Sequence, residues 1–148
     1  MIFYFFILFN DSKMNQYHSK NKRMYFHSGF NNPLTKTILD KIQKSTKIYF
    51  NDEFNQSIDD INCLYLQMGR DFNQPIRRTS FLLRGIFFGS KFNQSIENLC
   101  KDLMSVSFGK DFNHPIDDLG NWLIELEIGE LDGSSFNQTI NHLSNRLI

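Results

Sequence analysis

The sequence contains no alanine and a single valine, yet sixteen of its 148 residues are phenylalanine. Protein interiors are close-packed, and small aliphatic side chains normally fill the gaps between large ones. A core without them is expected to repeat one geometric cell, in which the same large side chain is used each time. The composition therefore directs attention to internal repeats.

Excess charge is also absent, because Lys plus Arg and Asp plus Glu both number 16. A neutral chain lacks the long-range attraction that nucleic acids and anionic membranes exert on basic proteins. The two cysteines, Cys63 and Cys100, each stand alone in the sequence. They form neither a disulfide framework nor a metal-ligand cluster, and we expect both to be free thiols.

The sequence has no long hydrophobic run. Residues 1–9 are apolar, but a membrane-spanning helix needs about 20 such residues. A basic start and a small-residue cleavage site, which mark a secretory signal, are missing. We therefore expect a cytoplasmic protein with no membrane partner.

A Phe-Asn-x-x-Ile motif recurs along most of the chain. Its six copies begin at Phe30, Phe54, Phe72, Phe92, Phe112 and Phe136, at steps of 24, 18, 20, 20 and 24 residues, and the first copy has Leu34 in place of Ile. Such regular spacing is typical of repeat architectures, in which each unit buries its apolar face against its neighbours.

The rest of the unit repeats as well. A short apolar alternation precedes each motif and predicts strands near residues 48–50, 66–68, 86–88, 106–108 and 126–128. Gly69, Gly89, Gly109 and Gly129 follow directly, where a turn or bulge favours glycine. Paired leucines such as Leu99 and Leu103 come after the motif. The pattern predicts a mainly β, parallel solenoid of about six repeats of roughly 20 residues, with helix expected only within 34–47.

The motif residues are expected to be structural. The Phe side chains would stack in the core, and each Asn amide would satisfy backbone groups of the neighbouring turn. This repeat core comprises Phe30, Asn31, Phe54, Asn55, Phe72, Asn73, Phe92, Asn93, Phe112, Asn113, Phe136 and Asn137. His114 replaces the Gln of other copies, and we expect it to make the same hydrogen bond.

The unit Phe72-Asn73-Gln74-Pro75-Ile76, with a strand and glycine before it and Leu-x-x-x-Leu after it, resembles the FNIP repeat. The resemblance covers residues 24–148 and implies a leucine-rich-repeat-like fold. Such repeats are typical of social amoebae and large amoeba-infecting viruses. Many members also carry an N-terminal F-box and resemble substrate receptors of ubiquitin ligases, but residues 1–23 are too short for an F-box.

Residues 1–23 form an N-terminal segment with two interpretations. Residues 7–16 echo the repeat, with Met14 in the place of the motif Phe, so the segment can be a degenerate copy that caps the sheet. Alternatively it is a leader outside the fold, with Met14 or Met24 as the true start. The repeat solenoid itself is assigned to residues 24–148.

Residues with catalytic potential are few. The four histidines occupy different parts of the unit, and Asp59-Asp60 and Asp117-Asp118 are expected to be solvated corners. Trp122 lies among leucines in the return segment and is expected to be a packing residue rather than a stacking platform. No nucleophile, base and orienting group occur together, so we expect neither an enzyme, nor a cofactor or metal, nor a small-molecule substrate.

The outward strand positions are the remaining candidates for function. They form two columns that change from aromatic and basic to acidic along the chain. Exposed aromatic side chains are common anchors of protein interfaces. The candidate binding residues are Tyr49, Tyr65, Gln67, Phe87, Ser107, Glu125 and Glu127. The sequence thus favours a protein-binding module; a ubiquitin-ligase receptor and a shortened repeat protein without selected function are the alternatives.

Overall fold

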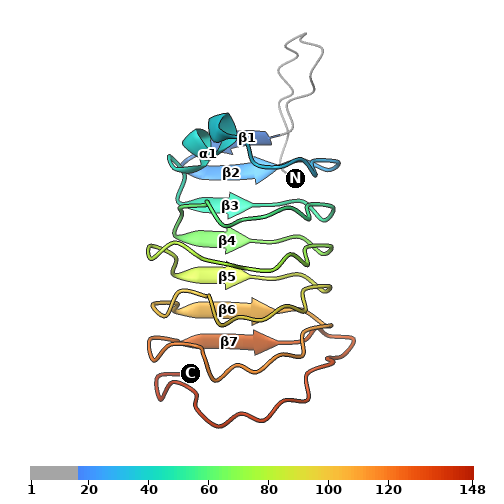
Figure 1. The fold of residues 1–148 in the computed structure, drawn as a ribbon, viewed down its shortest axis with the longest axis vertical. Helices are drawn as coiled ribbons and strands as arrows, with labels where there is room; N and C mark the ends of the chain where they lie inside the picture. Colours follow the sequence, from blue (N-terminus) through green and yellow to red (C-terminus); the bar gives the residue numbers. More distant parts are fainter. Residues whose placement is uncertain (1–16) are drawn as a thin grey trace, which may run out of the picture.

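A computed structural model describes residues 17–148, which form one seven-stranded sheet with the strands in sequence order. The elements are β1 (Tyr17–Lys20), β2 (Arg23–Phe26), α1 (Lys36–Ile42), β3 (Lys47–Tyr49), β4 (Tyr65–Gln67), β5 (Gly85–Phe87), β6 (Ser105–Phe108) and β7 (Glu125–Ile128). Figure 1 shows the strands stacked like rungs, with the turns at either side. The chain is a parallel β-solenoid with little helix, as predicted.

Strands β2 to β7 pair in parallel, each with the strand of the next turn. The predicted strands are confirmed, although β3 to β5 begin and end one residue earlier than expected. Their central residues Ile48, Leu66 and Ile86 are buried, and the residues on either side face outward. The helix expected within 34–47 is α1, whose Ile42 is buried against the core.

The sequence did not predict β1. This strand pairs antiparallel with β2 through a tight turn, in which Asn21 and Lys22 have φ of 52° and 60°. Positive φ at both central residues is the geometry of the turns that join two-residue hairpins. The hairpin covers the edge of β2 that faces away from β3. The echo of the repeat in residues 7–16 lies outside the described residues.

Two columns of aromatic rings fill the core. The motif column stacks turn upon turn, with ring centroids 5.9 Å apart for Phe72 and Phe92 and 6.1 Å for Phe92 and Phe112. A second ring from the end of a strand lies against it, and Phe88 and Phe92 are 3.8 Å apart. Burial of the motif Phe is thus confirmed in the first five copies, whereas Phe136 of the sixth copy is half-buried.

The motif asparagines form a ladder along the solenoid. The Asn73 Oδ1 accepts hydrogen bonds from the backbone N–H of Asn93 at 2.9 Å and from Nε2 of Gln94 at 3.0 Å. The same two bonds join Asn31 to Asn55 and Gln56, Asn55 to Asn73 and Gln74, and Asn113 to Asn137 and Gln138. These hydrogen bonds join successive turns, which is the contact that a structural role requires.

His114 departs from the expected pattern. Its Nε2 lies 3.2 Å from the backbone carbonyl oxygen of Asn93, whereas glutamine at this position donates to the asparagine side chain. The expectation of the same hydrogen bond was therefore wrong in its acceptor. The Asn93 side chain still accepts from the backbone N–H of Asn113 at 2.9 Å, so the ladder continues.

Most of the glycines after the strands are required for close approach rather than for a left-handed backbone. A Cβ on Gly89 would lie 2.4 Å from the carbonyl oxygen of Gly69, and one on Gly109 would lie 2.4 Å from that of Gly89. Only Gly129 among the four has a positive φ, of 96°. The turns thus touch backbone to backbone at this corner, which leaves no room for a side chain.

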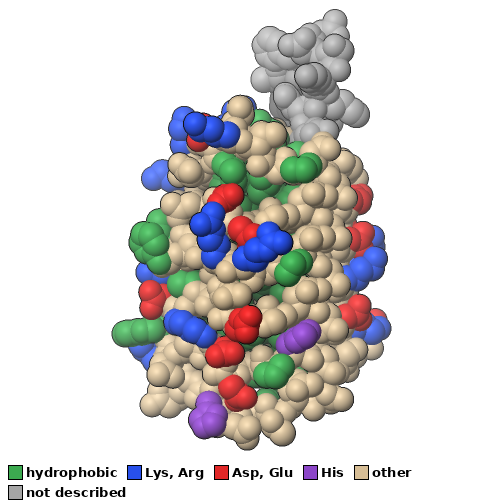
Figure 2. Space-filling model, viewed as in Figure 1, with side chains coloured by type: hydrophobic (Ala, Val, Ile, Leu, Met, Phe, Trp, Pro, Cys, Tyr) green, Lys and Arg blue, Asp and Glu red, His purple; other side chains and the backbone are tan. Residues whose placement is uncertain are grey.

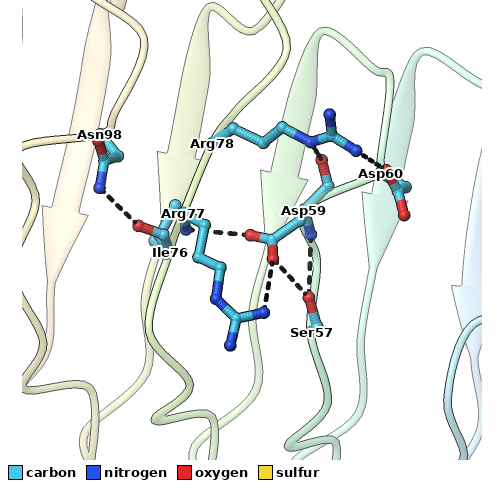
Figure 3. A network of polar contacts seen from close by, with 7 residues as sticks. All are labelled: Ser57, Asp59, Asp60, Ile76, Arg77, Arg78 and Asn98. Atoms are coloured by element: carbon cyan, nitrogen blue, oxygen red, sulfur yellow. Dashed lines mark hydrogen bonds and ion pairs between the residues drawn. The ribbon is translucent and has the colours of Figure 1, made fainter.

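The return segments are joined across turns by acidic side chains. Asp59 accepts a hydrogen bond from the backbone N–H of Arg77 at 3.0 Å and lies 3.7 Å from its guanidinium, while Asp60 pairs with Arg78 (Figure 3). The interpretation of Asp59-Asp60 as solvated corners was therefore incomplete. Exposed ion pairs contribute little, but the bond from Asp59 to a backbone N–H is part of the contact between turns.

Candidate functional site

The outward side chains of the strands form two columns across the sheet, and the pairing register confirms both. One column comprises Arg23, Lys47, Tyr65, Gly85, Ser105 and Glu125, and the other comprises Tyr25, Tyr49, Gln67, Phe87, Ser107 and Glu127. All the predicted binding residues lie on this sheet face. Because neighbouring strands are about 4.8 Å apart, each column is a continuous surface rather than a set of isolated side chains.

The N-terminal half of the sheet face is aromatic and basic. Tyr25 and Tyr49 stack with ring centroids 4.6 Å apart, and the ring of His18 in β1 stacks on Tyr25 at 5.0 Å. The ammonium group of Lys47 lies 4.7 Å from the centroid of the Tyr65 ring, within the range of a cation–π interaction. These rings support one another and are therefore held in fixed positions while partly exposed.

The aromatic surface continues past Tyr65 because Gly85, its partner on β5, has no side chain. A Cβ at Gly85 would lie 2.7 Å from the Tyr65 ring and 3.3 Å from the Phe87 ring. The glycine thus leaves the space in which the Tyr65 ring lies across β5. The sequence placed Gly85 in the column but gave no sign that a neighbouring ring fills its place.

The C-terminal half of the sheet face is small and acidic. Ser105 and Ser107 of β6 lie between Phe87 of β5 and the glutamates of β7. Together with Ile148 they line a hollow of about 500 Å³. The Ser105 hydroxyl donates to the Glu125 carboxylate at 2.9 Å. The sequence could not predict this hollow, because it results from serine lying between larger neighbours on both sides.

Charge is segregated on the sheet face but mixed elsewhere. In Figure 2, which shows one face of the molecule, acidic and basic side chains lie next to one another over the middle turns. Ion pairs between neighbouring turns include Asp60 with Arg78 and Asp71 with Lys91. On the sheet face, by contrast, Lys47 and Glu127 lie in different halves.

Histidine contributes to the edge of the sheet face. The Nδ1 of His18 and the Nε2 of His27 are 3.0 Å apart, so one ring nitrogen donates to the other. Burial, then the neighbouring His27 and Lys20, lower the pKa of His18. His114 and His142 lie in other parts of the solenoid. Among residues 17–148 no group of three or more metal-ligating side chains is present.

Two cysteines and one tryptophan complete the candidate residues. Cys63 and Cys100 are free thiols, as predicted, and burial raises the pKa of Cys63 to about 12. The expectation that Trp122 is a packing residue was wrong. Its side chain is 56% exposed, with the guanidinium of Arg146 4.7 Å from the ring centroid. Position 122 lies in the turn before β7, where Leu82 and Asp102 occupy the earlier copies.

The fold and sheet face define the class of protein as a leucine-rich-repeat-like solenoid. No helix within the described part of the chain is long and apolar enough to cross a membrane. No protein-family model and no curated protein matches the chain.

Among solved structures the chain is similar to CroV588, described as a novel circular leucine-rich-repeat protein. The two are 32% identical with a TM-score of 0.67, and the match covers 80% of this chain and 18% of CroV588. The chain thus corresponds to a minor part of that protein's length.

Proposed function

We propose that this chain is a non-enzymatic protein-interaction module and that the sheet face is its binding surface. Leucine-rich-repeat-like folds generally mediate protein interactions, and solenoids use extended surfaces of this kind. The observation that carries the proposal is the row of rings on β2 to β5. Tyr49, Tyr65 and Phe87 are partly exposed on this face.

The energetic argument rests on how these rings are held. Interface hot spots are enriched in aromatic residues whose loss of conformational freedom on binding is small. Tyr25 and Tyr49 are already stacked at 4.6 Å, and the Tyr65 ring already lies over Gly85. A partner therefore meets a preorganised surface.

The proposal includes the kind of repeat and the place where it acts. The similarity of the Phe-Asn-Gln-Pro-Ile unit to the FNIP repeat supports assignment to the FNIP type. We further propose that it acts in the cytoplasm, which is the host cytoplasm if the gene is viral.

Site-specific photo-crosslinking tests the proposal. Benzoylphenylalanine replaces Gln67, which is exposed on β4, or Glu97, which is exposed on a return segment. In the native cell we expect a discrete crosslinked protein from position 67 and none from position 97. Tyr49→Ala should reduce the crosslinked product about fivefold or more, as truncation of an aromatic anchor does.

Equal yields from the two positions would contradict a binding role for the sheet face. So would an undiminished yield in Tyr49→Ala. Because Tyr49 is only partly buried, its replacement should leave the fold intact, and far-UV circular dichroism of the variant provides the control.

A further inference from the structure

The hollow on the acidic half of the sheet face has a definite shape. Phe87, Ser107 and Glu127 are register partners on β5, β6 and β7. Two strand spacings separate the Phe87 and Glu127 backbones by about 9–10 Å. Only the small Ser107 side chain stands between the ring and the carboxylate. Ile148 lines the hollow as well.

The charge of the hollow is uncompensated. Within residues 17–148, neither Glu125 nor Glu127 has a lysine, arginine or histidine within ion-pair distance. Ser105 donates to one oxygen of Glu125. The other oxygen of Glu125 and both oxygens of Glu127 accept no hydrogen bond from the described residues. The hollow therefore offers acceptors to a cation and supplies no donor beyond Ser105 and Ser107.

The Phe87 ring, which lies opposite the glutamates, favours one kind of cationic side chain over the other. The Phe87 ring is partly exposed, and its face attracts cations that approach within about 6 Å of its centroid. A guanidinium group is planar, stacks on aromatic rings and donates in a fork to carboxylates at about 2.7–2.9 Å. An ammonium group is a compact point charge that stays strongly hydrated. An aromatic wall opposite two carboxylates favours the guanidinium.

We propose that the hollow receives an arginine side chain from the partner protein, stacked on Phe87 and paired with Glu125 and Glu127. This inference rests on the proposed function, because the hollow opens onto the same sheet face as the aromatic row. The inference specifies the partner's surface. An arginine lies there next to the groups that contact Tyr65 and Tyr49.

Nuclear magnetic resonance of the ¹⁵N-labelled chain tests the inference with acetyl-arginine-amide as the probe. We expect saturable shifts of the amide signals of Ser105, Ser107, Glu125 and Glu127. The citrulline counterpart, which has the same shape without the charge, should cause none. The double variant Glu125→Gln, Glu127→Gln should weaken binding about tenfold or more, since charge-assisted bonds become neutral. The matched control Glu97→Gln changes an exposed carboxylate elsewhere and should bind as the parent does.

A second measurement separates this inference from the proposed function. The photo-crosslink from position 67 is repeated in the Glu125→Gln, Glu127→Gln background, where we expect a loss of yield. Full crosslinking with no arginine-dependent shifts would overturn the arginine assignment and leave the interaction role standing. Shifts of equal size with acetyl-lysine-amide or with the citrulline probe would also overturn it. Arginine-dependent shifts without any crosslink would support the hollow's specificity and contradict the proposed function.

Discussion

Replacement of Phe92 by alanine tests the packing of the solenoid most directly. The Phe92 side chain is completely buried, and its ring stacks on Phe88 at 3.8 Å, on Phe72 at 5.9 Å and on Phe112 at 6.1 Å. Truncation of a buried phenylalanine costs about 3–5 kcal/mol. We expect the upper part of this range, because the rings above and below are fixed by their own turns and cannot collapse into the cavity.

Urea unfolding followed by circular dichroism gives the free energy of unfolding. For a chain of this size the expected loss corresponds to a fall in Tm of about 6–20 °C. Phe81→Ala is the matched control, since Phe81 is 74% exposed, and it should change stability by less than about 0.5 kcal/mol. A loss below about 1 kcal/mol for Phe92→Ala would refute the view that the motif column is the core.

Three further predictions address the ladder, the corner and the thiols. Asn73→Ala should lower the free energy of unfolding by about 1–3 kcal/mol, because the N–H of the next turn loses its acceptor; Asn137→Ala, which lacks a following turn among the described residues, should cost less in the same urea assay. Gly89→Ala should lower Tm by calorimetry, since its Cβ would lie 2.4 Å from a carbonyl oxygen; an unchanged Tm would show that the turns can move apart. Cys100 should react with a thiol reagent in the native state and Cys63 only on unfolding. Because burial raises the pKa of Cys63 from 9.0 to about 12, the unfolded chain loses this proton first, so stability should fall as pH rises from about 9 to 12.

The repeated part of the fold could be predicted because the same physical demand recurs in each copy. A strand of three residues such as Ile86 with its neighbours carries almost no signal alone. Because six copies recur at similar spacing, the strands could be recognised by comparing the copies. The same comparison showed which outward residues lie side by side on neighbouring strands. The role of Asn73 followed in the same way, since a corner without regular pairing must satisfy its backbone groups.

Features that occur once were beyond the sequence pattern. β1 has no counterpart among the repeats, and its pairing depends on the turn at Asn21 and Lys22. Trp122 has leucines nearby in the sequence, but its place in the turn decides its exposure. The hollow beside Phe87 depends on the sizes of side chains on three neighbouring strands. The predicted columns named these residues, but the space between their side chains could not be predicted.

The asparagine ladder gives each unit a direction. Every copy presents an oxygen acceptor to the copy after it and N–H donors to the copy before it, like a monomer in a head-to-tail polymer. Duplication of one whole unit in the gene would therefore extend the coil without creating a new kind of contact. Such an extension requires the Phe-Asn motif to stay the same in each copy. The outward strand positions take no part in the ladder and are free to vary. Length and recognition can consequently evolve separately.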